Sequence, residues 1–184
     1  KVFKFFKDNY KRFTFKHLIV APFNARRQFE MLIDYEIEQA KAGNEAYMLI
    51  KLNSIQDKEM AEKLYEASKA GVKIKLIARS INNVVNGIEG QSDNIEAISI
   101  VDRLLEHARI MLFCHGGEDL MYIGSADWMK RNLDGRVEVM VPIWDENIKK
   151  VLKKILRFQL KDNVKARLWN AELSNQYKSN GKNQ

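Results

Sequence analysis

Residues 47–79 read YMLIKLNSIQDKEMAEKLYEASKAGVKIKLIAR, and this stretch decides the fold class. The apolar run at 47–52 predicts a buried strand, and the apolar spacing after Asp57 predicts a helix that ends at Gly71. The apolar residues at 72–78 predict a second strand. Strand, helix and strand in this order indicate a parallel βαβ unit with a right-handed crossover.

The same alternation continues on both sides of this unit. His17 begins a short apolar run that reads as a strand and stops at Pro22. Asn24 is placed to cap a helix over about 25–42, whose apolar side chains share one face. Further expected elements are a strand at 95–101, a hairpin of 109–114 and 120–124 around Gly116-Gly117, a strand at 136–142 and a helix at 147–160.

These elements predict an α/β fold with a mixed, mostly parallel sheet flanked by helices. We expect one folded unit at residues 17–178. Residues 1–16 are expected to be a lead-in helix and linker from an upstream domain, and the polar residues 179–184 a disordered tail. The first residue is Lys1 rather than Met, so we expect the chain to be a piece of a longer polypeptide.

Charge and composition narrow the classes of partner. The formal net charge of the 184 residues is +7, which suits a polyanion such as a nucleotide, polyphosphate, nucleic acid or lipid headgroup, although many soluble domains are basic without a specific reason. Cys114 is the only cysteine, which excludes an internal disulfide and a cysteine-rich metal site, and fits a reducing cytoplasm. No apolar run approaches the roughly 20 residues that span a bilayer.

Two short motifs indicate phosphoryl chemistry. His107 is followed two positions later by Arg109, and side chains two apart on a strand share a face, so both could face one phosphate. With Gly124-Ser-Ala-Asp127, this pattern resembles half of the phospholipase D signature, in which a histidine, a basic residue and a Gly-Ser-x-Asn segment cradle a phosphoryl group. Here arginine stands in place of lysine, aspartate stands in place of asparagine, and the spacing to the glycine differs.

A longer series of strings follows in order along the chain. It comprises Ile19-Val-Ala-Pro-Phe-Asn24, Ala70-Gly-Val-Lys-Ile74, Ser99-Ile-Val-Asp-Arg103, Leu105-Glu-His107, Gly124-Ser-Ala-Asp-Trp-Met129 and Arg136-Val-Glu-Val139. Their order and spacing resemble the last domain of bacterial polyphosphate kinase over about residues 18–177. The resemblance implies a phospholipase-D-like domain.

The resemblance also implies an activity. Polyphosphate kinases reversibly transfer the terminal phosphate of ATP to inorganic polyphosphate with Mg²⁺, between two phospholipase-D-like domains that face each other. The phosphorylated histidine and the residues that hold Mg²⁺ belong to the earlier domain, which this sequence lacks. The chain is therefore expected to bind ATP or ADP and polyphosphate, to hold no metal itself, and to be inactive without the upstream domains.

The resemblance assigns roles to particular residues. The family's ATP-contacting arginine falls on Arg79, and its second histidine falls on His107, which is expected to bind ATP and to be catalytic. Arg136 falls on a basic residue that faces polyphosphate. The run at 80–87 departs from the family's Gly, Cys pair and Pro-Gly turn, so we expect the loop beside Arg79 to differ in shape from that of the family. Family members self-associate, so we expect a homo-oligomer in the cytoplasm without a specific nucleic-acid partner, and membrane association stays open.

Position along the chain supports some of these roles independently. Arg79 ends a central strand, and open α/β sheets bind ligands beyond the carboxyl ends of their strands. Arg109 could hold polyphosphate beside the histidine. Further residues are expected near the polyphosphate or its contacts: Asn24, Arg26 and Arg27 at a helix start, where the alternative is plain capping with solvated arginines, and Glu138, as an orienting group for Arg136 or His107.

Two other functions remain in view. One is a phosphodiesterase or nuclease of the phospholipase D type, which would need a lysine at position 109 and usually a second copy of the motif. The other is a module that binds a polyanion without reacting with it.

Overall fold

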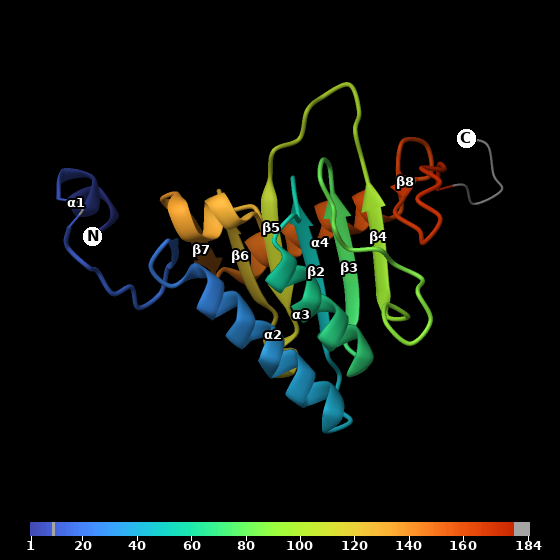
Figure 1. Ribbon diagram of the computed structural model, residues 1–184, viewed down its shortest axis with the longest axis horizontal. Helices are drawn as coiled ribbons and strands as arrows, with labels where there is room; N and C mark the ends of the chain where they lie inside the picture. Colours follow the sequence, from blue (N-terminus) through green and yellow to red (C-terminus); the bar gives the residue numbers. More distant parts are fainter. Residues whose placement is uncertain (9, 179–184) are drawn as a thin grey trace.

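The computed structural model describes residues 1–8 and 10–178, which form an eight-stranded sheet with helices on both faces (Figure 1). The helices are α1 (Val2–Lys7), α2 (Ala25–Lys41), α3 (Lys58–Lys69) and α4 (Glu146–Leu160), with short turns η1 (His115–Gly117) and η2 (Arg131–Gly135). The strands are β1 (Ile19–Ala21), β2 (Tyr47–Leu52), β3 (Lys73–Ala78), β4 (Ile95–Ser99), β5 (Arg109–Phe113), β6 (Leu120–Gly124), β7 (Glu138–Ile143) and β8 (Arg167–Leu168). The expected tail at 179–184 lies outside the described residues.

The sheet is mixed, in the order β1-β7-β6-β5-β2-β3-β4-β8. Among the described residues, only the pairs β2–β3 and β3–β4 are parallel. The α/β fold with a mixed sheet is as expected, but the expectation of a mostly parallel sheet is wrong. The hairpin of β5 and β6 is antiparallel as expected, around the tight turn η1 where Gly116 and Gly117 have φ of +67° and +93°. The sheet is mostly antiparallel because β5 also pairs antiparallel with β2, and β7 pairs antiparallel with both β6 and β1.

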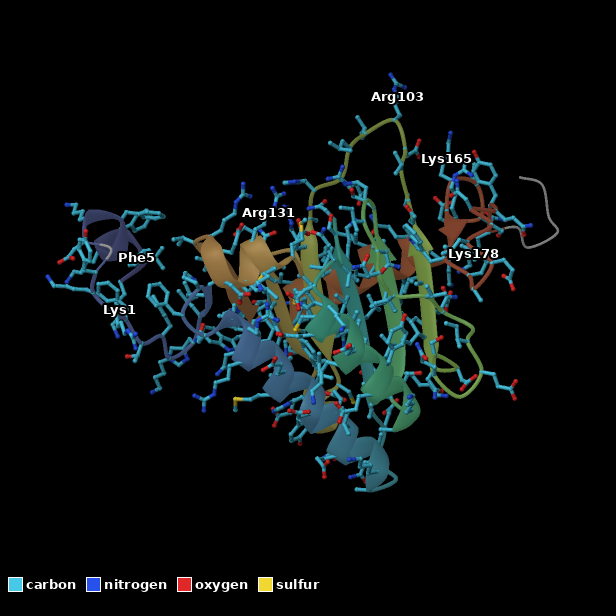
Figure 2. All side chains as sticks on the ribbon, in the orientation of Figure 1. Lys1, Phe5, Arg103, Arg131, Lys165 and Lys178 are labelled. Carbon is cyan, nitrogen blue, oxygen red and sulfur yellow. The ribbon has the colours of Figure 1, made fainter. Side chains whose placement is uncertain are left out.

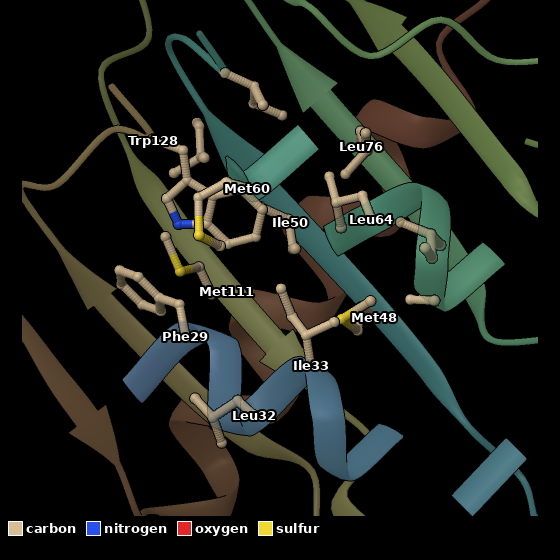
Figure 3. Packing of buried hydrophobic residues seen from close by; sticks show 14 of the residues in the cluster. Phe29, Leu32, Ile33, Met48, Ile50, Met60, Leu64, Leu76, Met111 and Trp128 are labelled. Atoms are coloured by element: carbon tan, nitrogen blue, oxygen red, sulfur yellow. The ribbon is translucent and has the colours of Figure 1, made fainter. Parts of the chain in front are cut away.

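The larger core lies between the sheet and the helices α2 and α3 (Figure 3). Phe29 and Ile33 from α2, and Met60 and Leu64 from α3, are fully buried against β2 and the indole of Trp128. Burial of each such side chain contributes about 1.5–3 kcal/mol to the free energy of folding. This apolar burial holds the βαβ unit in the place that the sequence predicts.

A second core lies on the opposite face, under α4. Leu156 and Leu160 of this helix cover Ile77, Ile98 and Ile110 of the sheet. The helix begins with a side-chain cap, in which the Asp145 carboxylate accepts hydrogen bonds from the first turn. Among the described residues, no helix is both long and apolar enough to cross a membrane.

Asn24 precedes α2, as expected, but its side chain does not cap that helix. Its Oδ1 accepts from the backbone N–H of Val20 at 2.7 Å, and its Nδ2 donates to the carbonyl of Leu18 at 3.3 Å. The expected cap is therefore wrong, because the amide is already used to close the turn after β1. The expected lead-in helix is present only over Val2–Lys7, at a distance from the sheet (Figure 1).

Arg26, in the first turn of α2, ties three segments together. Its guanidinium forms two hydrogen bonds of 2.7 and 2.8 Å with Asp57, the cap of α3, and two of 2.8 and 3.0 Å with Asp134 in η2. Glu59 adds an ion pair at 2.7 Å. The side chain of Asp57 is 5% exposed, and the hydrogen bonds from Arg26 are the main reason that the pKa of Asp57 lies below its ordinary value.

Replacing Arg26 by Met is expected to lower the free energy of unfolding by about 2–3 kcal/mol at pH 7, because it leaves the Asp57 carboxylate buried without its counter-charge. Since the pKa of Asp57 is depressed in the fold, the stabilisation is present above its unfolded pKa and is lost as the pH falls through the folded pKa. Urea unfolding of both proteins at pH 7 and in acid measures the difference. An Arg27→Met variant, at an exposed position of the same helix turn, is the control, and a pH-independent difference would contradict the assignment.

Candidate functional site

The candidate site lies at one edge of the sheet, where β2 and β3 end and β5 begins. Leu52 at the end of β2 pairs with Ala78 at the end of β3, while Lys51 pairs with Ile110 of β5. The residues just beyond these strand ends therefore meet. They are Asn53 after β2, Arg79 after β3 and Arg109 at the start of β5.

Asn53 joins Arg79 to a buried carboxylate. Its Oδ1 accepts from Nε and Nη2 of Arg79 at 3.1 and 2.9 Å. Its Nδ2 lies 3.3 Å from both carboxylate oxygens of Asp127, and its backbone N–H donates to Oδ1 of Asp127 at 2.8 Å. Because the amide oxygen and the amide nitrogen have different partners, the orientation of this side chain fixes the guanidinium of Arg79 relative to the carboxylate of Asp127.

Asp127 in turn holds Arg109. The guanidinium donates to Oδ2 at 3.0 Å and to Oδ1 at 3.3 Å, and Asp127 also lies 3.3 Å from the backbone nitrogen of Ser54. Burial raises the pKa of Asp127, but the hydrogen bonds from Arg109 and Asn53 outweigh that effect, so the pKa lies below its ordinary value. Asp127 is thus a carboxylate at neutral pH, and it supplies the negative charge that orients Arg109.

His107 completes the sequence of contacts. Its Nδ1 lies 2.9 Å from Nη1 of Arg109, and its Nε2 lies 3.2 Å from Nη2. Nη1 also donates to the carbonyl of His107 at 3.0 Å. A neutral imidazole has one acceptor nitrogen, so one of the two ring contacts is a hydrogen bond and the other is packing of the ring against the guanidinium. The imidazole is exposed at the outer end of this network.

Arg79 and His107, the two residues that the resemblance assigns to the site, therefore belong to one connected network of contacts. The connection runs from Arg79 through Asn53, Asp127 and Arg109 to His107. Arg79 also lies between two surface cavities of about 440 and 410 Å³. The first is lined by residues of the β4–β5 connection, and the second includes Arg167 and Trp169. A ligand can thus approach this guanidinium from either side.

The residues of the Gly-Ser-Ala-Asp motif at 124–127 have different roles in the structure. A side chain at Gly124 would collide with the carbonyl oxygen of Val139, so glycine is needed here for the close approach of β7. The hydroxyl of Ser125 accepts from the backbone N–H of Val139 at 3.2 Å. Only Asp127 of the motif reaches the network around Arg109. The first half of the motif therefore shapes the sheet, and its last residue shapes the site.

Other predicted site residues lie apart from this network. Arg136 is exposed just before β7, at the same sheet edge, while Arg27 is exposed on α2. Arg26 is engaged by its three carboxylates and Asn24 by the backbone. Glu138 was expected to orient Arg136 or His107. The structure differs, because its buried carboxylate accepts a hydrogen bond from Nδ2 of Asn132 at 2.6 Å.

Sequence reasoning missed two residues of the site. Asn53 is the hub between Arg79 and Asp127, and Lys51 forms an ion pair of 2.7 Å with Glu106, the neighbour of His107. A signal for Asn53 was present, because it follows a predicted parallel strand just as Arg79 does. Lys51 carried no such signal, since a lysine inside an apolar run usually points to solvent.

Comparison with known proteins gives consistent matches. A family model described as polyphosphate kinase C-terminal domain 2 matches residues 18–184. Polyphosphate kinase of Vibrio cholerae is 48% identical over 180 residues, and that of Escherichia coli K12 is 42% identical over 181 residues. Each of these alignments covers 98% of this chain and 26% of the relative, so the chain spans about a quarter of the length of these relatives.

Solved structures agree with the sequence matches. The crystal structure of polyphosphate kinase from Porphyromonas gingivalis superposes with a TM-score of 0.88 at 43% identity, over 93% of this chain and 26% of that one. The phospholipase D family member Nuc from Salmonella typhimurium superposes with a TM-score of 0.59 at 14% identity, over 84% of this chain and 97% of that one, which shows a shared fold. The chain has a phospholipase-D-like fold and belongs to the polyphosphate kinase family, as its C-terminal domain 2.

Proposed function

We propose that this chain is part of an enzyme that reversibly transfers the terminal phosphate of ATP to inorganic polyphosphate, and that Arg79 and His107 contact the transferred phosphate or its neighbours. One observation supports this most directly. Two guanidinium groups and an imidazole are joined in a single network at the edge where β2 and β3 end. Such an edge is where open α/β sheets bind ligands.

The chemistry of phosphoryl transfer suits this arrangement. The reaction depends mainly on positioning and on neutralising charge, and fixed guanidinium groups do both. Asp127 is already paired with Arg109, while the hydrogen bonds that the structure shows from Arg79 go to the neutral amide of Asn53. We therefore assign Arg79 to bind the anionic phosphates of ATP. His107, as the exposed proton-carrying group, would donate a hydrogen bond or a proton to the leaving ADP oxygen.

Magnesium is proposed to be held by residues outside this chain and by the phosphates of ATP. Among the described residues, no group of three or more His, Cys, Asp or Glu side chains is placed to hold a metal ion. The carboxylates nearest the site are also engaged, Asp127 by Arg109 and Glu106 by Lys51. In this proposal the chain supplies its positively charged side chains to the reaction, and the upstream domains of the same polypeptide supply the residues that hold Mg²⁺.

Polyphosphate is proposed to pass along the same sheet edge toward Arg136. The start of β7 lies at this edge, because Met140 pairs with Gly124 of β6 and Gly124 pairs with Arg109 of β5. Arg27 is a second exposed cation on the neighbouring helix α2. Arg26 and Asn24 are left out of the proposal because their polar atoms are engaged within the protein. Assembly into a homo-oligomer remains part of the proposal for the intact enzyme.

Replacing Arg79 or His107 by Ala in the polyphosphate kinase polypeptide that carries this domain is expected to lower polymer synthesis by about 100-fold each, because each removes a preorganised cation or proton donor. Incorporation of labelled phosphate from ATP into acid-insoluble polymer measures the rate. Arg157→Ala and His17→Ala, at exposed positions outside the network, are the matched controls. Near-normal synthesis by both site variants would refute the assignment.

Replacing Asn53 by Leu is expected to weaken ATP binding by about tenfold although Asn53 carries no charge, because Arg79 loses its partner and Asp127 loses one of its donors. Titration calorimetry with ATP measures the affinity of the Asn53→Leu variant and of the unchanged protein. Asn44→Leu is the control, since Asn44 is exposed beyond the C-terminus of α2, and its side chain contacts Gln39. Unchanged affinity in the Asn53 variant would show that the hub does not position Arg79 for the nucleotide.

The 184-residue chain by itself is expected to bind ATP or tripolyphosphate weakly and to make no polymer. The reason is that electrostatic clamps lower a barrier only when the nucleophile is also in place. Incubation with ATP, Mg²⁺ and a polyphosphate primer, followed by gel analysis of the polymer, tests this. Robust synthesis by the chain alone would refute the need for the upstream domains.

A further inference from the structure

The connection between β4 and β5 is a long loop that rises above the functional edge of the sheet (Figure 1). Every residue from 101 to 108 is exposed, including the apolar Leu104 and Leu105. Arg103 lies near the highest point of the loop and projects away from the domain (Figure 2). A segment with so little buried surface has no packing of its own to hold it in one place.

The side chains that attach this loop to the domain belong to two neighbouring residues. Among the described residues, the hydrogen bonds between positions 101–108 and the rest of the chain all involve Glu106 or His107. Glu106 accepts from Nζ of Lys51 at 2.7 Å and from the side-chain amide of Gln159 in α4. The loop is therefore anchored where it carries the catalytic candidate.

Lys51 is unusual for a lysine because its side chain is 8% exposed. It lies in β2 among apolar neighbours, and its ammonium pairs with Glu106, whose side chain is 52% exposed. Burying an ammonium group without a counter-charge raises the free energy of the folded state, so Lys51 needs a carboxylate within ion-pair distance. The hydrogen bond from Lys51 is the largest cause of the depressed pKa of Glu106, which keeps that partner ionised at neutral pH.

We propose that Lys51 is a positioning residue, which holds the loop at 100–108 through Glu106 and thereby fixes His107 against Arg109. This inference rests on the proposed function and adds to it a residue that does not touch the substrate. The anchoring ion pair joins the sheet to the loop at the residue next to the imidazole. The site would thus be ordered from two sides, by Arg109 and by Lys51.

The same ion pair shapes the space beside Arg79. Glu106, the partner of Lys51, and Gln159, which also donates to Glu106, line the cavity of about 440 Å³ that also includes Arg79. Loss of the anchor would release both the wall of this cavity and the imidazole. Arg79 itself would stay in place, because its contact is with Asn53 rather than with the loop. Loss of the anchor is therefore expected to lower turnover and to leave the affinity for the nucleotide nearly unchanged.

Lys51→Met, Glu106→Gln and the double variant test the inference. In the ¹⁵N-labelled chain without ligand, we expect the heteronuclear NOE of residues 101–108 to drop in each single variant and no further in the double variant. In the polyphosphate kinase polypeptide that carries this domain, we expect kcat to fall by about tenfold while KM for ATP changes by less than about twofold, because Arg79 is intact.

Lys75→Met is the matched control, since Lys75 lies on the adjacent strand β3 in a half-exposed ion pair with Glu96. Because Glu106 is exposed, Glu106→Gln keeps the test valid if Lys51→Met does not fold. Unchanged loop NOEs in Glu106→Gln would overturn the anchor, and lower NOEs with unchanged kcat would overturn its role in positioning. If instead Arg79→Ala and His107→Ala leave synthesis intact, the proposed function fails, and the NOE result remains a separate measurement.

Discussion

The candidate site depends on the hydrogen bonds that the carboxylate of Asp127 accepts. This carboxylate is buried, it is ionised, and it receives hydrogen bonds from Arg109, from the side chain of Asn53 and from the backbone of β2's end. A buried carboxylate is stable only when its oxygens accept hydrogen bonds, so the donors around Asp127 have a definite place in the fold. Arg79 and His107 take their positions from these donors, one step removed from the buried charge.

The topology explains why this network can form at all. Strand β2 is parallel to β3 on one side and antiparallel to β5 on the other. The ends of β2 and β3 therefore meet the beginning of β5 at a single edge. In a fully parallel sheet, the start of β5 would lie at the opposite edge, and Arg109 with its histidine could not reach Asn53 and Asp127. The antiparallel pairing of β5 with β2, which the sequence did not predict, is thus what assembles the site.

Positive charge alone does not identify the functional cations of this chain. Arg26, Arg79 and Arg109 all lie near strand or helix ends at the same edge, yet their partners differ. Arg26 is neutralised by three carboxylates and joins α2, α3 and η2, whereas Arg109 shares one buried carboxylate and Arg79 contacts a neutral amide. The first arrangement contributes to stability, and the second neutralises Arg109 with the carboxylate of Asp127. Of the three arginines, Arg79 is the one whose hydrogen bonds in the structure go to a neutral group, which is why the proposal assigns the anion to it.

The sequence by itself determined the βαβ unit, the hairpin and the family, and it singled out Arg79 and His107, whose roles stay a proposal. These follow from local apolar periodicity, turn residues and motif order, which act over short stretches of chain. Only the tertiary structure decided the partners: the pairing of Lys51 with Glu106, the hub at Asn53, and the carboxylates around Arg26. These contacts join residues 26 to 108 positions apart, and no local pattern records which buried polar group meets which.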